Sequence, residues 1–517
     1  MKTFAARFAG ALLLLAALSG SALAQVATAS TFNGILTVIW GDPKPGTASA
    51  GAMRFELTLP NGAVYPLQLA PGQQNEAVQL FGKRVTVQGR MAASATPGGR
   101  TPIVVDGMTS AEPRNAAPEQ QVRAKVTRKV LFVLLRFKGD TQRPHPATFY
   151  TRELTNPLVP PAGSKALATI NGFFNNTSWG NLHWQGAVVG ANGFNSTQWF
   201  TLPKTKHQYA PCGWNGDCAD LTQIQIDALA LIDGAGVNWK TYDNINFVLN
   251  NDLDCCAWGG SFSHGGKVYG ATWEPPWGQE ASTYVHELGH SIGLPHSGWR
   301  YYAYDSHHDE MSRGNPARIA VCGHYTSAND GNILENIDCT EPGAGYIVAH
   351  KDYLGWIPAA NKRTVNTVGK RNFIIEANAR PLGSRLKMVK ICLNSWACNG
   401  GDGTRARFLT LAARIKAGKY ENGLPSEGIV IHDVLMNRGP IGGHCFFNDQ
   451  SGWAVPIDAT PGDFNTTTCQ PMDKPGFGLM DMPFVVGKTY NNPVLGVTVK
   501  VLSKTATTYT VQVNKTK

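Results

Sequence analysis

The chain has 517 residues, of which 43% are hydrophobic and 16% are charged, with 56 glycines and 31 prolines. This composition excludes a largely disordered chain and favours several packed, turn-rich domains. The formal net charge is +10, but the basic residues are scattered and form no nucleic-acid motif. We therefore expect no nucleic-acid partner, while peripheral contact with acidic surfaces stays open.

The first 24 residues have the three parts of a signal peptide. Lys2 and Arg7 are basic, residues 9–18 are apolar, and residues 22–24 (Ala-Leu-Ala) form a small-x-small cleavage site. The apolar run is shorter than the roughly 20 residues that span a bilayer, and no later run is long enough, so we expect no transmembrane anchor. The sequence thus predicts a secreted, extracellular protein.

All ten cysteines lie between Cys212 and Cys469. An even number of cysteines in an exported chain predicts disulfide bonds, and no paired C-x-x-C signature favours cysteine-ligated zinc. The spacing favours four local pairs: Cys212 with Cys218, Cys322 with Cys339, Cys392 with Cys398, and Cys445 with Cys469. The adjacent Cys255 and Cys256 either bridge each other or pair elsewhere.

Three packed units are expected after the signal peptide. Residues 25–115 predict a small N-terminal β-barrel or sandwich, because β-rich runs alternate with turn residues. These runs are 34–40, 53–59, 78–81, 84–89 and 103–105. Residues 116–128 form a linker with basic residues at its end, which suits cleavage by a protease or is only a solvated tether.

The second and third units complete an α+β fold. Residues 129–362 contain buried-strand runs at 130–135 and 245–249 and helical spacing at 221–232. In residues 363–517 the strand-like runs return, which predicts a C-terminal β-sandwich. Those runs are 373–376, 408–412, 428–434, 497–502 and 509–513.

The strongest chemical signal is a histidine motif in the second unit. His286 and His290 are four residues apart, so a helix places both imidazoles on one face. Gly293 can end that helix with a conformation that other residues resist, and His296 can then return as a third ligand. Incidental histidines on a buried helix are the main alternative, and a third histidine in register disfavours it.

Three neutral nitrogens leave the fourth position of a tetrahedral zinc ion open for water. Zinc lowers the pKa of that water from about 15.7 toward 7. Glu287 follows the first ligand directly and can accept the proton of the water and deliver it to the leaving amine. A purely structural zinc site would not need this carboxylate, so the motif predicts a catalytic site with one Zn²⁺ ion.

The motif H-E-x-x-H-x-x-G-x-x-H of residues 286–296 resembles the long zinc motif of the metzincin peptidases. The resemblance implies a metzincin-type catalytic domain with a methionine turn below the zinc, for which Met311 is the candidate. Residues 129–140, 350–358 and 427–434 are similar to segments of the gametolysin-type peptidases. Arg313 stands where astacins and serralysins carry a tyrosine ligand, which counts against those two subfamilies.

The resemblance also implies that substrate binds as an added strand at a sheet edge above the zinc. The segment before the zinc helix resembles that edge strand, and it consists of Lys267, Val268, Tyr269, Gly270, Ala271 and Thr272. Trp273 and Trp277 either line the cleft or pack in the core. Five residues between His296 and Met311 are candidates for binding the oxyanion, and the sequence does not favour one of them. They are Tyr301, Tyr302, Tyr304, His307 and His308.

The mechanism of any latency stays open at this level. A cysteine switch is excluded because no cysteine precedes Cys212. Residues 137–140 (Phe-Lys-Gly-Asp) superficially match an astacin-type aspartate switch, but their place at the end of a strong strand favours a structural role. The N-terminal domain is either a prodomain that blocks the cleft until it is cut off, or a permanent binding module.

We therefore expect a secreted zinc endopeptidase that hydrolyses extracellular proteins or glycoproteins, with Glu287 as general base and acid. The metal ligands are His286, His290 and His296. An adhesin or carbohydrate-binding protein on the same scaffold is the alternative from another class, and Glu287 together with the three histidines disfavours it. A cell-wall zinc amidase is a weaker alternative, and a structural Ca²⁺ ion is left open.

Overall fold

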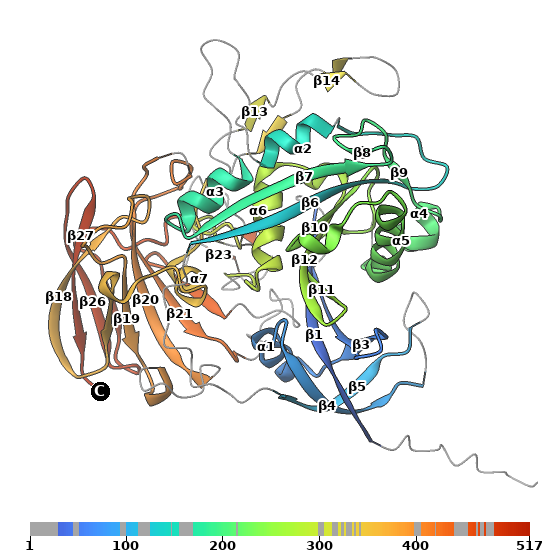
Figure 1. Ribbon diagram of the computed structural model, residues 1–517. Helices are drawn as coiled ribbons and strands as arrows, with labels where there is room; N and C mark the ends of the chain where they lie inside the picture. The colour runs from blue at the N-terminus through green and yellow to red at the C-terminus, as the bar shows by residue number, and fades with distance from the viewer. Residues whose placement is uncertain are drawn as a thin grey trace, which may run out of the picture.

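The structure is a computed structural model, and most of the chain is described (Figure 1). Strands dominate, helices are few and short, and several sheets are present, so the mixed α+β class is confirmed. No described helix is long and apolar enough to cross a membrane. The predicted signal peptide, residues 1–24, lies outside the described residues. These residues are 29–44, 51–93, 100–111, 125–145, 147–154, 169–213, 216–297, 304, 306–312, 319–321, 325–326, 333–334, 338–340, 343–397, 405–418, 420–438, 453–461, 464–465, 470–471 and 480–517.

The N-terminal strands close into a barrel, drawn in blue in Figure 1. The ring runs β1-β2-β3-β5-β4 and returns to β1, with β3 and β5 parallel and the other neighbours antiparallel. Alternate residues of β1, Leu36, Val38 and Trp40, point into the barrel core. Its elements are β1 (Ser30–Pro43), β2 (Ala52–Thr58), β3 (Val64–Gln68), α1 (Pro71–Gln79), β4 (Arg84–Met91) and β5 (Ile103–Ser110).

One predicted strand of this unit is wrong. Residues 78–81 were expected to be extended, but the helix α1 runs to Gln79 and a turn follows. Val78 is buried in the barrel core from the end of this helix. A short apolar run marks burial and does not distinguish a strand from a helix.

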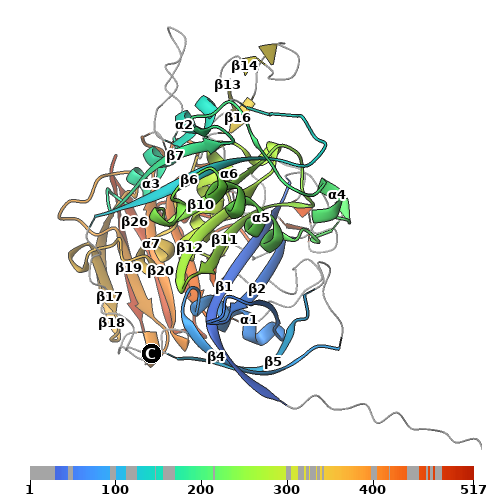
Figure 2. The same cartoon turned by 45° about the vertical axis from the view of Figure 1, so that its right-hand side comes forward.

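The strand β1 also joins the barrel to a central sheet (Figure 2). The sheet order continues β1-β11-β12-β10-β6-β7-β8, with β9 beside β6. β11 is antiparallel to both β1 and β12, whereas β12, β10, β6 and β7 are parallel to one another, and β8 is antiparallel to β7. The strands are β6 (Val126–Arg136), β7 (Leu182–Gly190), β8 (Gly193–Phe194), β9 (Phe200–Thr201), β10 (Asn244–Leu249), β11 (Cys256–His264) and β12 (Lys267–Glu274).

Helices cover both faces of the central sheet. Leu131, Val133 and Leu135 of β6 pack in one core with α5, while Val130 and Phe132 pack in another with α2, α3 and α6. The predicted buried strands and the helix at 221–232 are confirmed. The helices are α2 (Ala147–Leu154), α3 (Ile170–Thr177), α4 (Lys206–Tyr209), α5 (Leu221–Gly234) and α6 (Ala281–Ser291), with short 3₁₀ helices η2 (Trp239–Thr241) and η3 (Pro276–Gly278).

The boundary of this unit differs from the prediction by three residues. β6 begins at Val126 and pairs with β7 from there, so the last part of the predicted linker 116–128 belongs to the strand. Residues 112–124 lie outside the described part.

The segment that follows the zinc motif forms small two-stranded sheets, in which β13 pairs with β16 and β14 with β15. A short helix, α7, then leads to the C-terminal unit. These elements are β13 (Ile319–Val321), β14 (Tyr325–Thr326), β15 (Ile333–Leu334), β16 (Asp338–Thr340) and α7 (Val348–Tyr353).

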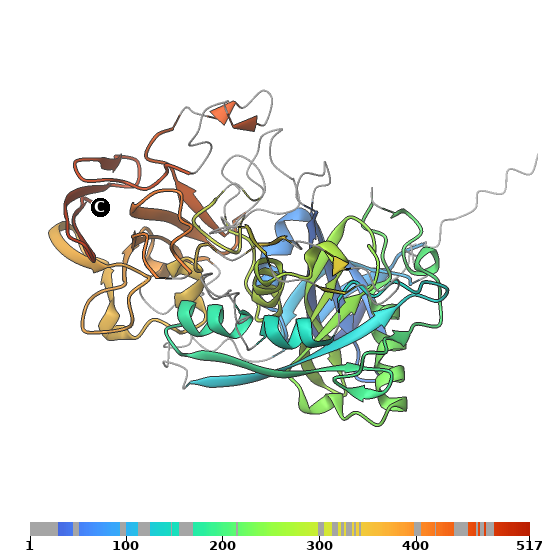
Figure 3. The same ribbon diagram turned by 90° about the horizontal axis from the view of Figure 1, so that it is seen from above.

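The C-terminal unit contains two packed sheets and lies to one side of the central sheet (Figure 3). One sheet has the order β17-β19-β20-β21-β22 and the other β18-β27-β26-β25, and residues of both share one core. The structure thus contains the sandwich that its alternating runs predict. Its elements are η4 (Ala359–Asn361), β17 (Lys362–Val365), β18 (Gly369–Glu376), β19 (Met388–Cys392), η5 (Ser395–Ala397), β20 (Arg407–Arg414), β21 (Gly428–Leu435), β22 (Ala454–Ile457), β23 (Phe464–Asn465), β24 (Gln470–Pro471), β25 (Thr489–Asn492), β26 (Val497–Lys504) and β27 (Thr508–Lys515).

Two disulfide bonds are described, Cys212–Cys218 and the vicinal pair Cys255–Cys256. The first was predicted, and the second settles the alternative left open for the adjacent cysteines. Cys392 is also disulfide-bonded, while its predicted partner Cys398 lies outside the described residues. The other two predicted pairs include cysteines outside the described residues and stay predictions.

Candidate metal centre

The three predicted ligands come together at the end of α6. His286 and His290 lie on one face of this helix, which is followed by Gly293 at a φ of 91°. The amide of Gly293 donates to the carbonyl of His290, so the glycine ends the helix as predicted. His296 returns to the other two histidines, and all three side chains are nearly inaccessible, with exposures of 8%, 0% and 3%.

Backbone carbonyls fix the orientation of two imidazoles. Nδ1 of His286 lies 2.6 Å from the carbonyl oxygen of Glu310, and Nδ1 of His290 lies 2.7 Å from that of Leu294. Because a carbonyl oxygen only accepts hydrogen bonds, both Nδ1 atoms carry the hydrogen. Each Nε2 atom is therefore left with a lone pair, which is the form that binds a metal.

The Nε2 atoms converge at one point. Nε2 of His290 lies 3.2 Å from Nε2 of His286 and 3.2 Å from Nε2 of His296. Lone pairs that face each other repel unless a cation lies between them. In a tetrahedral zinc site with bonds of about 2.0–2.1 Å, neighbouring ligand atoms lie about 3.3 Å apart. The histidines therefore fit a single zinc ion.

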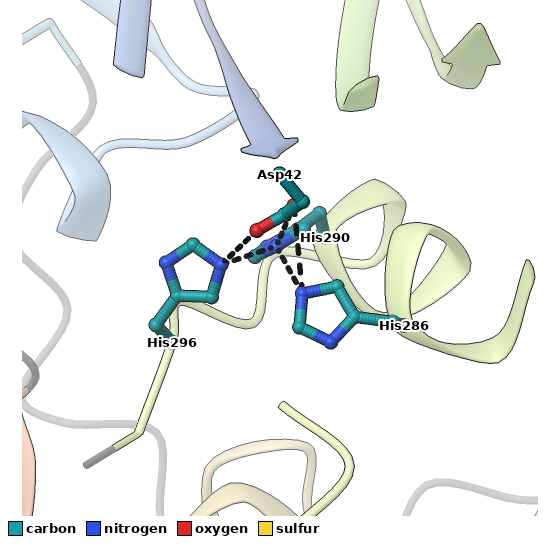
Figure 4. A group of neighbouring side chains, drawn as sticks. All are labelled: Asp42, His286, His290 and His296. Carbon is teal, nitrogen blue, oxygen red and sulfur yellow. Dashed lines mark hydrogen bonds and ion pairs between the residues drawn. The ribbon is translucent and has the colours of Figure 1, made fainter. Parts of the chain in front are cut away.

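A fourth residue, Asp42 at the end of β1, faces this point (Figure 4). Its Oδ1 lies 2.7 Å from Nε2 of His296, and its Oδ2 lies 3.3 Å from Nε2 of His290 and 3.5 Å from Nε2 of His286. Among the described residues, these four form the single group of three or more His, Cys, Asp or Glu side chains that could hold one ion. A structural calcium ion accordingly gains no support.

Asp42 was not among the predicted ligands. It lies 254 residues before His296 and in another unit, so no motif spacing includes it. Asp140, the residue that superficially resembled an aspartate switch, instead accepts hydrogen bonds from Gln142 and Asn251 at the end of β6. Its structural interpretation was therefore the better one.

Glu287 lies next to the converging histidines and is fully buried. Neither of its carboxylate oxygens has a hydrogen-bond partner among the described residues. Burial, and then the nearby charges of Asp42 and Glu274, raise its pKa well above the usual value. A buried carboxyl group with an elevated pKa suits a residue that must accept and release a proton.

A strand of the central sheet passes close to this carboxylate. A Cβ atom on Gly259 of β11 would lie 2.5 Å from both the carbonyl oxygen and Oε2 of Glu287. The glycine thus allows the strand to cross directly over the zinc helix.

Met311 lies against α6 and is fully buried. A Cβ atom on Gly289 would be only 2.2 Å from its Sδ, so the methionine fills the space that this glycine leaves beside His290. This placement suits the expected floor below the metal. The assignment as a metzincin methionine turn stays a prediction.

The predicted substrate strand is not an edge strand. Residues 267–272 belong to β12, which pairs with β11 on one side and β10 on the other. Gly270, Ala271 and Thr272 pair on both sides, so the edge prediction is wrong for them, whereas the first three residues of the segment pair with β11 alone. A role of the six residues in binding substrate stays a prediction. Trp273 of the same strand is fully buried against Phe247 in the core, so it does not line a cleft.

The candidate residues for binding the oxyanion do not all lie at the histidine cluster. The hydroxyl of Tyr304 donates to Oδ1 of Asp42, and its ring lies 5.0 Å from that of His296. His308 instead points to the carbonyl of Met480 in the C-terminal unit, at 3.1 Å. Tyr301 and Tyr302 lie outside the described residues.

Residues 184–375 match the family model of the gametolysin peptidases M11. This is a family of zinc metallopeptidases. The matched segment contains the three histidines, Glu287 and Met311, and the resemblance to gametolysin-type peptidases is thereby confirmed. No curated protein matches the chain. The match supports a metallopeptidase whose substrate is a protein and whose metal is zinc.

Proposed function

We propose that this chain is a secreted zinc endopeptidase of the metzincin type that hydrolyses extracellular proteins or glycoproteins. The observation that carries the proposal is the convergence of three imidazole Nε2 atoms beside the buried carboxyl group of Glu287, which has no hydrogen-bond partner in the described part of the chain. Two of the imidazoles are fixed by carbonyl groups, so the metal-binding atoms are oriented before any ion binds.

A bound zinc ion would lower the pKa of water and polarise the scissile carbonyl group. The three histidines would hold the ion, since their Nε2 atoms converge at one place. Glu287 accepts the proton of the attacking water and delivers it to the leaving amine.

The secreted location rests on the signal peptide predicted from residues 1–24. The two described disulfide bonds are compatible with an oxidising compartment. The choice of extracellular proteins or glycoproteins as substrates follows from that location.

The test is cleavage-site profiling on a mixed protein library, with measured zinc content. We expect about one zinc per chain and hydrolysis that a chelator abolishes and added zinc restores. Glu287→Gln keeps the size of the side chain, so it should keep the metal and lose roughly 10²–10⁴-fold in rate, as expected for removal of a general base. Undiminished hydrolysis in the zinc-free protein, or unchanged turnover in this variant, would refute the proposal.

A further inference from the structure

We propose that the N-terminal barrel is an inhibitory domain, with Asp42 as a removable fourth ligand of the metal and β1 as a strand that occupies the substrate edge. This inference rests on the proposed peptidase function. It chooses between the two roles, prodomain or permanent module, that the sequence left open for residues 25–115.

The first observation is the position of the Asp42 carboxylate. It faces Nε2 of all three histidines at 2.7–3.5 Å, on the side where water must bind for hydrolysis. A catalytic zinc site keeps one position open, whereas four protein ligands close it. With Asp42 in place, the site has the ligand number of a structural zinc site.

The second observation is the edge of the catalytic sheet. β12 occupies one side of β11, and β1 occupies the other through antiparallel pairs that run from Ile39 opposite Gly260 to Pro43 opposite Cys256. An added strand of this kind is how a peptide binds to a sheet edge. The pairing includes Asp42 and so ends beside the three histidines, where the same segment would cover both the edge and a bound metal.

Two aromatic contacts hold this segment at the site. The Trp40 ring stacks on His290 with centroids 4.7 Å apart and planes 10° apart. The hydroxyl of Tyr304 donates to Oδ1 of Asp42, and its ring lies 5.0 Å from that of His296. Trp40 and Asp42 are two residues apart on β1 and lie on one face of the strand, which lines the barrel core up to Trp40 and reaches the three histidines at Asp42.

The rest of the barrel contacts the catalytic unit through apolar and charged groups, and Ile39 and Ala52 are part of the hydrophobic core of that unit. Arg54 lies 3.8 Å from Asp254, and its guanidinium lies 4.0 Å above the Trp258 ring. Arg100 forms an ion pair with Asp220 at 3.2 Å. The charged contacts suit domains that separate, whereas the apolar contacts of Ile39 and Ala52 are lost when the barrel leaves.

The chain between the two units allows such a separation. β5 ends at Ser110 and β6 begins at Val126, so a cut between them leaves every barrel strand and every catalytic strand whole. Arg114 and Arg123 lie in this interval. An arginine-specific peptidase would hydrolyse one peptide bond there, with water supplying the hydroxyl of the new carboxyl group and a hydrogen of the new amine.

The first experiment uses the full chain loaded with Co²⁺, whose visible spectrum reports the ligands. Asp42→Ala is compared with Asp106→Ala, an exposed carboxylate elsewhere on the barrel. We expect only Asp42→Ala to change the visible bands of Co²⁺. This variant should also lose the metal to a chelator at least about 10-fold faster than the unmodified chain, since even substitutions next to metal ligands lower metal affinity by this factor.

The second experiment does not depend on the folding of a variant. The full chain is nicked by an arginine-specific peptidase, which is then inhibited, and the fragments are separated by gel filtration. We expect hydrolysis of a quenched peptide to rise about 100-fold after the barrel leaves, because the competent fraction increases from about 1% toward unity. Nicked Glu287→Gln is the control for residual activity of the added peptidase, and Arg114→Gln/Arg123→Gln should resist activation.

The outcomes separate this proposal from the proposed function. If the chain binds metal and hydrolyses peptides, but Asp42→Ala leaves the Co²⁺ spectrum unchanged and nicking leaves the rate unchanged, the inhibitory role is overturned and the peptidase stands. If neither the intact nor the nicked chain binds metal or hydrolyses peptides, the function itself fails, and this inference fails with it.

Discussion

Replacing Gly259 by alanine tests the closest approach in the site. The added Cβ would lie 2.5 Å from the carbonyl oxygen of Glu287, 2.5 Å from its Oε2 and 2.8 Å from its Cα. Favourable non-bonded contacts between such atoms are about 3.5–4.0 Å, so the strand and the helix must separate by about 1 Å. Two of the three atoms belong to the backbone of α6, so a side-chain rotation cannot relieve the overlap.

The expected cost is the upper part of the range for overpacking, about 3 kcal/mol. For a unit of about 150–250 residues, each kcal/mol lowers Tm by about 2–4 °C, which predicts a decrease of about 6–12 °C. The displacement also moves Glu287 relative to the histidines. A shift of about 1 Å in a catalytic group is expected to lower the rate by roughly 10²-fold.

The assay is thermal unfolding of the zinc-loaded protein together with the rate of peptide hydrolysis. Gly107→Ala in β5 is the matched control, because it is also a strand glycine and a Cβ there would meet no atom within 4 Å. Equal midpoints for the two variants, or a Gly259→Ala enzyme with full activity, would show that β11 does not press on the zinc helix as described.

Three further predictions concern buried groups around the site. Burial lowers the pKa of His432 in the folded protein to about 3. Between pH 6.5 and 3 the unfolded chain therefore binds more protons than the folded chain, so the folded state loses stability as pH falls, by about 2 kcal/mol at pH 5. His432→Asn should reduce the decrease in Tm between pH 7 and 5, whereas His207→Asn, at an exposed position, should not. Parallel curves of Tm against pH for the unmodified protein and both variants would contradict this. Met311→Ala should cost about 2–5 kcal/mol in thermal unfolding and Met311→Leu less than about 1.5, and equal losses would mean that Met311 does not fill its site. The buried Arg414 lies 2.8 Å from Glu421, so Arg414→Met should cost about 3–5 kcal/mol and Arg414→Met/Glu421→Met much less, while strictly additive effects in this cycle would exclude the coupling.

The local part of the site was predictable because it depends on one helix and one turn. The spacing of His286, His290 and His296 fixes their geometry once residues 281–291 are helical and Gly293 ends the helix. Buried strands such as β6 and β10 were also predictable, because continuous apolar runs are typical of strands that are covered on both faces.

Strand order was not predictable from the same patterns. β11 and β12 are adjacent in the chain, and both are almost wholly buried. Their side chains do not indicate which of the two strands pairs with a further strand, because sheet order depends on backbone pairing between distant segments. The substrate edge was therefore assigned to β12, one strand away from the strand that β1 covers.

The role of Asp42 could not be predicted from the sequence for the same reason, since it depends on where the barrel docks. In the sequence it is one carboxylate between Gly41 and Pro43, without a neighbouring histidine or cysteine. The position becomes informative only when β1 lies along β11 and ends beside the three histidines.

The way β1 is built also determines how the site can open. Leu36, Val38 and Trp40 of this strand are buried in the barrel core, with exposures of 0% each. Peeling β1 away from the barrel would expose all three side chains, at about 1.5–3 kcal/mol each, or roughly 5–9 kcal/mol together. β1 pairs at seven positions with β2 and at six with β4, but at only five with β11 of the catalytic sheet. Because the barrel holds the strand through more backbone pairs than the catalytic sheet does, Asp42 should leave the metal only when the whole barrel leaves. Fraying of β1 alone would then contribute little activity, and hydrogen exchange in the intact chain should show the β1 amides opening together with those of β2 and β4.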